Sequence, residues 1–308
     1  MSDTAPRPAR RGTGRGAGPR GGAPSAAPCR LRARPSSSDG DFRVRGGSPL
    51  LAPPAPAEHA GCGGPRGRRT RDQEETLMKI GIIGAGNIGG TLTRRLTALG
   101  HEVAVANSRG PETLTALASE TGARAVTVSE APRGADLVVV TIPENRIPDL
   151  PPDLFHEAPE DLIVVDTGNY YPRQRDGRIE EIEAGLAESR WVERQLHHPV
   201  IKAFNNIYAQ HLGGNGRPAG AAGRIALPVA GDDPRAKTVV MDLVNALGFD
   251  PVDTGGLDES WRQQPGSPVY TTDKDAEGVT HGLADADRQR APEWSATSDS
   301  PGTFEAPA

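Results

Sequence analysis

The sequence predicts an α/β protein: a doubly wound, mainly parallel sheet followed by a smaller C-terminal α/β domain. Three observations lead to this prediction. Short apolar runs alternate with helical patterns between residues 78 and 273, a glycine-rich turn joins the first run to the first helix, and the composition changes sharply outside these limits. Repeated strands and helices of this kind are typical of a parallel sheet covered by helices on both faces.

The first strand and its turn carry the clearest signal. An apolar run over residues 79–83 is followed by glycines at positions 84, 86 and 89, in the order G-x-G-x-x-G, and then by a helical pattern. Strand, glycine turn and helix in this order form the dinucleotide-binding fingerprint. Gly84 permits the tight turn, Gly86 lets the backbone approach a pyrophosphate, and Gly89 lets the helix pack closely on the strand. We therefore predict that residues 84–89 (Gly84, Ala85, Gly86, Asn87, Ile88 and Gly89) bind the coenzyme.

The helix after this turn has an apolar face made by residues 88, 92, 96 and 99, and Gly100 stands where a left-handed C-terminal residue belongs. A second strand over residues 102–106 follows directly. These elements fit within about thirty residues, the size of one βαβ unit. They predict a Rossmann-type nucleotide-binding domain over residues 78–170.

The alternation continues along the chain. We expect a helix over residues 111–121 that begins at a proline, a short strand over 123–128, and buried parallel strands over 136–142 and 161–166.

The second half, residues 171–273, predicts the smaller domain. Its elements are a helix over 179–189, strands over 199–204 and 224–230, a helix with Pro234 in its first turn that ends before Gly248, and an extended segment over 250–253. Asp232 or Asp233 caps that helix, and these acids repel anions, so no second phosphate site is expected there.

The two ends differ from this core. Residues 1–77 contain 14 Arg, no Lys and 7 acidic residues, with no apolar period, which predicts a disordered extension. Two interpretations of it stay open: a basic arm for nucleic acid, or, favoured, an extension upstream of the true start at Met78. Residues 274–308 predict a flexible acidic tail. Both cysteines lie in the first 77 residues, and no apolar run could span a bilayer, so a cytoplasmic protein without membrane contact is expected.

The segment after the second strand indicates which dinucleotide is used. NAD-selective sites usually place a carboxylate there, but this chain has Asn107, Ser108 and Arg109. A guanidinium can pair with a 2′-phosphate through its planar fork, and a serine hydroxyl can donate to it. The sequence therefore predicts NADP(H) as the cofactor.

The same segments resemble those of a known family. Ile-Gly-Ile-Ile-Gly-Ala-Gly-Asn-Ile-Gly-Gly (residues 80–90) and Ala-Asn-Ser-Arg-Gly-Pro (106–111) are similar to the N-terminal half of NADPH-dependent coenzyme F420 reductases. Ile-Lys-Ala-Phe-Asn-Asn (201–206) and Leu-Pro-Val-Ala-Gly-Asp-Asp (227–233) resemble the C-terminal half. The resemblance implies a Rossmann domain, a small second domain, a homodimer, and hydride exchange between NADP(H) and an 8-hydroxy-5-deazaflavin, coenzyme F420.

Such a reaction needs aligned rings rather than a nucleophile, because both coenzymes carry their own electron chemistry. The loops after the fourth and fifth strands should line the crevice at the carboxyl edge of the sheet. They supply Thr141, Ile142, Pro143 and Asn169. By resemblance, Ile142 and Pro143 press on the nicotinamide, with ordinary packing as the alternative. Lys202, Asn205 and Asn206 are candidates for contact with the deazaflavin or the nicotinamide amide, and Lys202 is the candidate catalytic residue, with a surface lysine as the alternative.

Other functions remain open at this level. A reductase of another acceptor (an imine, a quinone or a metal complex) and an NADP(H)-binding sensor without turnover would use the same nucleotide site. His197, His198 and His211 match no standard zinc spacing, so no metal is expected. The partners expected are a small redox coenzyme and a second copy of the chain, with nucleic acid disfavoured.

Overall fold

The computed structural model describes residues 77–288 and 302–307, all within one compact unit that spans residues 69–308. The predictions for residues 1–76, including the two cysteines, lie outside the described residues, as does the part of the predicted tail at 289–301 and 308.

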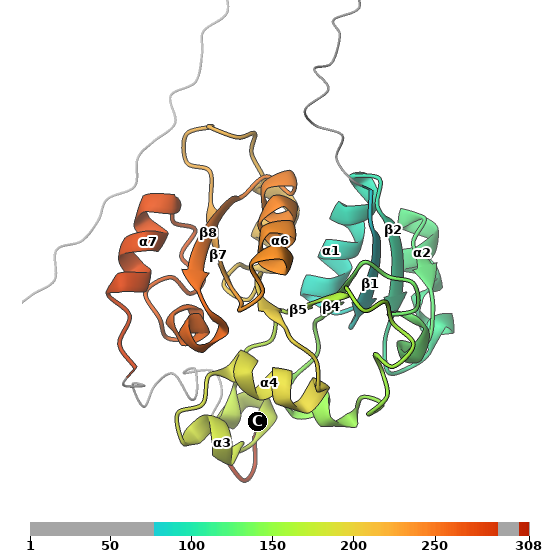
Figure 1. Ribbon diagram of the computed structural model, residues 1–308, viewed down its shortest axis with the longest axis horizontal. Helices are drawn as coiled ribbons and strands as arrows, with labels where there is room; N and C mark the ends of the chain where they lie inside the picture. The colour runs from blue at the N-terminus through green and yellow to red at the C-terminus, as the bar shows by residue number, and fades with distance from the viewer. Residues whose placement is uncertain (1–76, 289–301, 308) are drawn as a thin grey trace, which may run out of the picture. The chain divides into compact units, whose positions relative to one another are not determined.

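Eight strands and seven α-helices make up the described part of the chain (Figure 1). The strands are β1 (Lys79–Ile83), β2 (Glu102–Ala106), β3 (Arg124–Ala125), β4 (Leu137–Val140), β5 (Ile163–Asp166), β6 (Ile201–Lys202), β7 (Ala226–Ala230) and β8 (Asp250–Gly255). The helices are α1 (Asn87–Ala98), α2 (Thr115–Thr121), α3 (Glu180–Glu183), α4 (Glu188–Leu196), α5 (Ala209–Gly214), α6 (Pro234–Ala246) and α7 (Ala276–Ala284). The 3₁₀ helices are η1 (Pro111–Leu114), η2 (Val128–Glu130), η3 (Glu144–Asp149) and η5 (Leu257–Gln263), and η4 (Pro172–Asp176) is a turn of π-helix.

All eight strands belong to one sheet, in the order β3-β2-β1-β4-β5-β6-β7-β8. The first six are parallel and follow the order of a doubly wound nucleotide-binding sheet. β7 pairs antiparallel with β6 through Lys202 and Ala230, and β8 runs parallel to β7. The predicted Rossmann-like α/β class is confirmed. The strands of the second half extend this sheet, so β7, α6 and β8 form a further βαβ unit at its edge (Figure 1).

Two apolar layers cover the two faces of the sheet, and β4 shows how the strands divide between them. Leu137 and Val139 pack with Leu92 and Leu96 of α1. Val138 and Val140 pack on the other side, in the cluster that includes Trp191 of α4. This alternation explains the uninterrupted apolar run in β4, because a parallel sheet is buried on both faces.

Two helices end just before the glycines that the sequence predicted as their ends. Gly100 has φ +95° and follows α1, and Gly248 has φ +94° and follows α6. Of the two predicted caps for α6, Asp233 is the one used, since its carboxylate accepts hydrogen bonds from the amides of Arg235 (2.8 Å) and Ala236 (3.3 Å). That carboxylate occupies the start of α6, in keeping with the expectation that no phosphate binds there.

Two element predictions are wrong. The helix expected over 179–189 is two helices, α3 and α4, because Gly185 between them has φ +101°, and α4 continues to Leu196. The segment 274–308 is not wholly a flexible tail: α7 lies within it, with Asp275 capping its first turn. α7 is held because Val279 and Leu283 bury their side chains against Ala226 and Val269.

The predicted helix over 111–121 begins with the 3₁₀ turn η1, and β3 is shorter than the strand predicted over 123–128. No helix within residues 77–288 or 302–307 has the length and apolar character needed to cross a membrane.

Candidate functional site

The glycine turn between β1 and α1 has the geometry that its sequence predicts. Gly84 has φ +108°, and a Cβ there would lie 2.2 Å from the carbonyl oxygen of Thr141. A Cβ on Gly89 would lie 1.9 Å from the carbonyl oxygen of Gly84. Both glycines are therefore required by close backbone packing. Gly86 differs, because a Cβ there would meet nothing within 4 Å. The space above Gly86 is open, and this is the place where the fingerprint brings a pyrophosphate to the backbone.

The start of α1 is suited to an anion. Gly86 is its N-cap and offers no side chain to the first amides, and the first turn contains no acidic residue. The unpaired amides and the positive end of the helix dipole therefore face the open space beside Gly86.

A pocket of about 530 Å³ lies along this turn and gathers most of the predicted coenzyme residues. It is lined by the predicted residues Gly84, Ala85, Gly86, Asn107, Ser108, Arg109, Thr141, Ile142 and Pro143. Sequence reasoning missed six more lining residues. One is Ile83, the last residue of β1, and the other five are Val128 of η2, Arg146 and Asp149 of η3, and Leu150 and Pro151 directly after η3. No local motif marks these five, because they reach the pocket only through the packing of distant segments.

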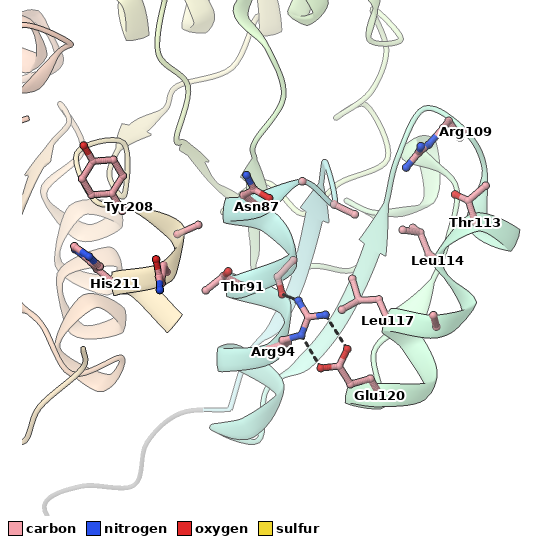
Figure 2. Close-up of a pocket in the computed structure, with 16 residues that line it drawn as sticks. Asn87, Thr91, Arg94, Arg109, Thr113, Leu114, Leu117, Glu120, Tyr208 and His211 are labelled. Atoms are coloured by element: carbon pink, nitrogen blue, oxygen red, sulfur yellow. Dashed lines mark hydrogen bonds and ion pairs between the residues drawn. The ribbon is translucent and has the colours of Figure 1, made fainter. Parts of the chain in front are cut away.

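The loop that follows β2 is fixed by its own side chains. Asn107 Oδ1 accepts a hydrogen bond from the amide of Arg109 (2.9 Å), and Asn107 Nδ2 donates to Thr113 Oγ1 (2.9 Å). Arg109, whose amide is held in this way, lines the wall of the pocket. Figure 2 shows Arg109 turned toward the space between the start of α1 and Thr113.

A second, larger groove of about 990 Å³ crosses the outer side of α1 and shares Ala85, Gly86 and Arg109 with the first pocket. The predicted residue Asn87 lines this groove, as do Thr91 and Tyr208 (Figure 2). The remaining predicted residues of the turn have other positions: Ile88 packs against the apolar core and Gly89 is buried beneath the turn.

The structure corrects the expectation for Lys202. Its side chain is completely buried, so it is not a surface lysine, and it lines none of the pockets described here. Lys202 Nζ donates to Asp166 Oδ2 (2.9 Å) and to the carbonyl oxygen of Gly168 (2.6 Å). Burial alone would lower the pKa of Lys202, but the neighbouring carboxylate of Asp166 holds it above its ordinary value. Lys202 therefore lies below the loop after β5, without direct access to a ring bound in either pocket.

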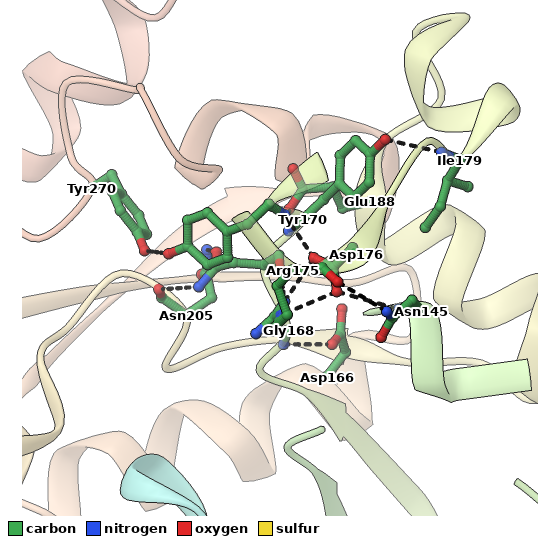
Figure 3. A network of polar contacts seen from close by, with 12 residues as sticks. Asn145, Asp166, Gly168, Tyr170, Arg175, Asp176, Ile179, Glu188, Asn205 and Tyr270 are labelled. Atoms are coloured by element: carbon green, nitrogen blue, oxygen red, sulfur yellow. Dashed lines mark hydrogen bonds and ion pairs between the residues drawn. The ribbon is translucent and has the colours of Figure 1, made fainter. Parts of the chain in front are cut away.

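Buried carboxylates hold the loop that follows β5 (Figure 3). The amide of Gly168 donates to Asp166 Oδ1 (2.7 Å), and the amide of Tyr170 donates to Glu188 Oε2 (3.2 Å). The amide of Tyr171 donates to Asp176 Oδ2 (2.7 Å). Because these amides are bonded to carboxylates from three different elements, the backbone of residues 168–171 has little freedom.

The predicted residues Asn169 and Asn205 are brought together by this loop. Asn205 Nδ2 donates to Asn169 Oδ1 (3.1 Å), and Asn169 Nδ2 donates to the carbonyl oxygen of Asn205 (2.9 Å). Gln263 Nε2 donates to Asn205 Oδ1 (3.0 Å), a contact that the sequence did not suggest. The hydroxyl groups of Tyr171 and Tyr270 form a hydrogen bond above this network. Hydrogen bonds of side-chain amides thus join the loops that follow β5 and β6.

Two of these three histidines have ordinary polar partners. His211 pairs with Asp273 (2.6 Å), and His198 Nδ1 contacts the carbonyl oxygen of Pro199 (2.7 Å). Across the described ranges, no group of three or more His, Cys, Asp or Glu side chains could hold a metal ion.

Part of this chain matches a known protein family. Residues 79–170 match the family described as "NADP oxidoreductase coenzyme F420-dependent". The protein YjhV of Escherichia coli (strain K12) is 55% identical over 62 residues, which are 20% of this chain and 45% of that protein. The chain thus spans less than half of the length of this curated relative.

Two solved structures are similar to this chain. A hypothetical protein, SMa0349, from Sinorhizobium meliloti is 30% identical, with a TM-score of 0.54, over 64% of this chain and 94% of that one. A structure named as a putative F420-dependent NADP-reductase, from Arthrobacter sp. FB24, is 24% identical with a TM-score of 0.47, over 58% of this chain and 86% of that one. Together with the glycine turn and its pocket, the match over residues 79–170 places an NADP-binding oxidoreductase domain in this protein. The chain therefore belongs, at the level of this domain, to the coenzyme F420-dependent NADP oxidoreductase family.

Proposed function

We propose that this protein exchanges a hydride between NADP(H) and an 8-hydroxy-5-deazaflavin coenzyme of the F420 type. The choice of NADP(H) is supported by the glycine turn. The space above Gly86 is open, no side chain caps the start of α1, and Arg109 lies on the wall of the same pocket. The family description, which names coenzyme F420, supports the choice of acceptor.

The residues present fit a nucleotide with three phosphate groups. The pyrophosphate would be held by main-chain amides of residues 85–87, where the dipole of α1 favours negative charge. The 2′-phosphate would pair with Arg109 and accept a hydrogen bond from Ser108. Val128 and Leu150 would supply apolar surface in the same pocket for the flat adenine ring.

The remaining residues would align the rings rather than react with them. NADP(H), when bound, supplies the hydride, so the protein has to orient its nicotinamide and keep water away. Thr141, Ile142 and Pro143 follow β4 at the carboxyl edge of the sheet, next to the loop of Gly168 and Asn169. Ligands of doubly wound sheets bind at this edge, where the connections leave in opposite directions.

The test is an assay of NADPH oxidation by the full chain, followed at the absorbance band of NADPH. A deazaflavin, a flavin, a quinone and a cyclic imine are offered separately. We expect saturable oxidation with the deazaflavin. Oxidation only with one of the other acceptors would overturn the acceptor assignment, and NADPH binding without oxidation by any of them would favour a sensor.

Arg109→Ala tests the coenzyme assignment. We expect it to weaken NADP(H) binding by about 1–3 kcal/mol, because a charge-assisted contact to the 2′-phosphate is lost, while NAD(H) binding changes much less. Calorimetric titration of both nucleotides measures this. Arg133→Ala is the matched control, since Arg133 pairs with Glu157 on an exposed surface and lines neither pocket. Equal losses for both nucleotides would contradict the role given to Arg109.

A further inference from the structure

Glu144 is a buried acid that the proposed function does not use. It begins η3, directly after Pro143 of the coenzyme pocket, and its side chain is completely buried. Neither carboxyl oxygen has a hydrogen-bond partner among the described residues. A buried carboxyl group without a hydrogen bond lowers the stability of the fold, because a buried polar group normally has a partner. Its retention beside a ligand pocket suggests a role other than stability.

The position of Glu144 depends on a glycine. A Cβ built on Gly168 would lie 2.5 Å from Glu144 Oε1 and 3.0 Å from Asp166 Oδ1. The carboxyl group of Glu144 therefore occupies the space that any other residue at position 168 would fill. This contact joins the segment after β4 to the segment after β5, the two segments that would flank the nicotinamide.

The charges that face Glu144 come from every element packed around it. They are Asp166 of β5, Lys202 of β6, Glu188 of α4, and Asp176 and Arg175 of η4. Three acids therefore face two cations before Glu144 is counted. Burial raises the pKa of Glu144 well above its usual range, and the carboxylate of Asp166 raises it further, while Lys202 acts in the opposite direction.

We propose that Glu144 is a positioning residue for the nicotinamide end of the coenzyme site: its uncharged carboxyl lets Gly168 and Asn169 lie against the segment after β4, and its ionisation displaces them. This inference rests on the proposed function for the identity of the coenzyme. The contact itself is a property of the protein alone.

The consequence of ionisation follows from the contacts of the loop. A charge on Glu144 would repel Asp166, whose Oδ1 accepts the hydrogen bond from the amide of Gly168. Movement of Gly168 also moves Asn169, and so disturbs its paired hydrogen bonds with Asn205. The phosphate end of the site, at Gly86 and Arg109, lies in other segments and is not touched.

The experiment compares the full-length parent with Glu144→Gln, which keeps the size of the side chain and cannot ionise. The affinity for NADPH is measured by calorimetry from pH 7 to pH 9.5. We expect the parent to lose up to about tenfold in affinity for each pH unit above the pKa of Glu144. Glu144→Gln should lack this decline. Groups remote from Glu144 titrate alike in both proteins, so their contribution cancels in the comparison.

A second readout needs no coenzyme. The acid is uncharged in the folded protein over a pH range in which it ionises in the unfolded chain, so it lowers stability increasingly as the pH rises above about 4.3. The thermal midpoint of Glu144→Gln should therefore exceed that of the parent, by a margin that widens from pH 5 to pH 8. Glu157→Gln, at an exposed glutamate paired with Arg133, is the control and should show no such widening.

The outcomes separate the two proposals. A parent that binds no NADPH at pH 7 overturns the proposed function and, with it, the coenzyme role of Glu144. A parent that binds NADPH but shares its pH profile with Glu144→Gln overturns the inference alone. If Glu144→Gln does not fold, Glu144→Met also removes the titration, and the same absence of an alkaline decline is expected for it. If the affinity of Glu144→Met for NADPH declined with pH as steeply as that of the parent, the inference would be wrong.

Discussion

The buried ion pair between Lys202 and Asp166 makes the sharpest stability prediction. Replacing Lys202 with Met keeps the length and apolar stem of the side chain but removes the ammonium. Asp166 would then keep its hydrogen bonds from Ser189 Oγ (2.7 Å) and from the amide of Gly168 (2.7 Å), but it would lose its counter-ion in a site closed to water. Removal of one partner from a buried pair typically costs about 3–5 kcal/mol, because the other charge stays buried.

The pH dependence of this effect has a definite sign. The pKa of Lys202 is raised in the folded protein, so the stabilisation by its charge is fully present below the pKa of the unfolded chain and is lost only as the pH passes the folded value. The loss caused by Lys202→Met should therefore be nearly constant between pH 6 and pH 9. A loss that disappears at pH 9 would contradict a charged lysine.

Urea unfolding at pH 7 measures the change. Lys237→Met is the matched control, because Lys237 pairs with the half-exposed Asp253. This substitution should lower the free energy of unfolding by less than about 1 kcal/mol. Adding Asp166→Asn to Lys202→Met should restore part of the lost stability, since no unpaired charge then remains. A loss below about 1 kcal/mol for Lys202→Met, or no restoration in the double variant, would refute the reasoning.

Two further predictions follow from the geometry. Gly89→Ala should destabilise the fold by about 1–3 kcal/mol in urea unfolding, because its Cβ meets the carbonyl oxygen of Gly84, whereas Gly86→Ala should unfold like the parent yet bind NADPH more weakly in calorimetry. Equal stability losses in the two variants would contradict the separate roles of the glycines. Arg190→Met should lower stability by about 1–3 kcal/mol, because Arg190 joins Glu193, Asp232 and Asp258 at 2.5–2.8 Å. An unchanged unfolding midpoint would show that this cluster contributes nothing.

The geometry of the glycine turn was predictable because its determinants are local. A positive φ at Gly84, an unobstructed Gly86 and a tightly packed Gly89 all lie within six consecutive residues, and Arg109 follows the next strand at a fixed distance along the chain. Such spacing is set by the geometry of one βαβ unit, so it can be read without knowing the rest of the fold.

The two element predictions that failed have different causes. The helix α7 was missed because the residues that bury Val279 and Leu283 include Ala226, which is distant along the chain. The break between α3 and α4 depends on one glycine, Gly185, whose left-handed φ the sequence allows but does not require.

By itself, the sequence determined the class of the sheet, the glycine turn and the kind of coenzyme that this turn suits. Only the tertiary structure decided that Lys202 is enclosed against Asp166 and that the carboxyl of Glu144 is sealed beside Gly168. The physical reason is that the charge state and reach of a side chain depend on its burial and its neighbours. Those neighbours come from η3, β5, β6, α4 and η4, segments that are separated along the chain and meet only when the sheet has formed.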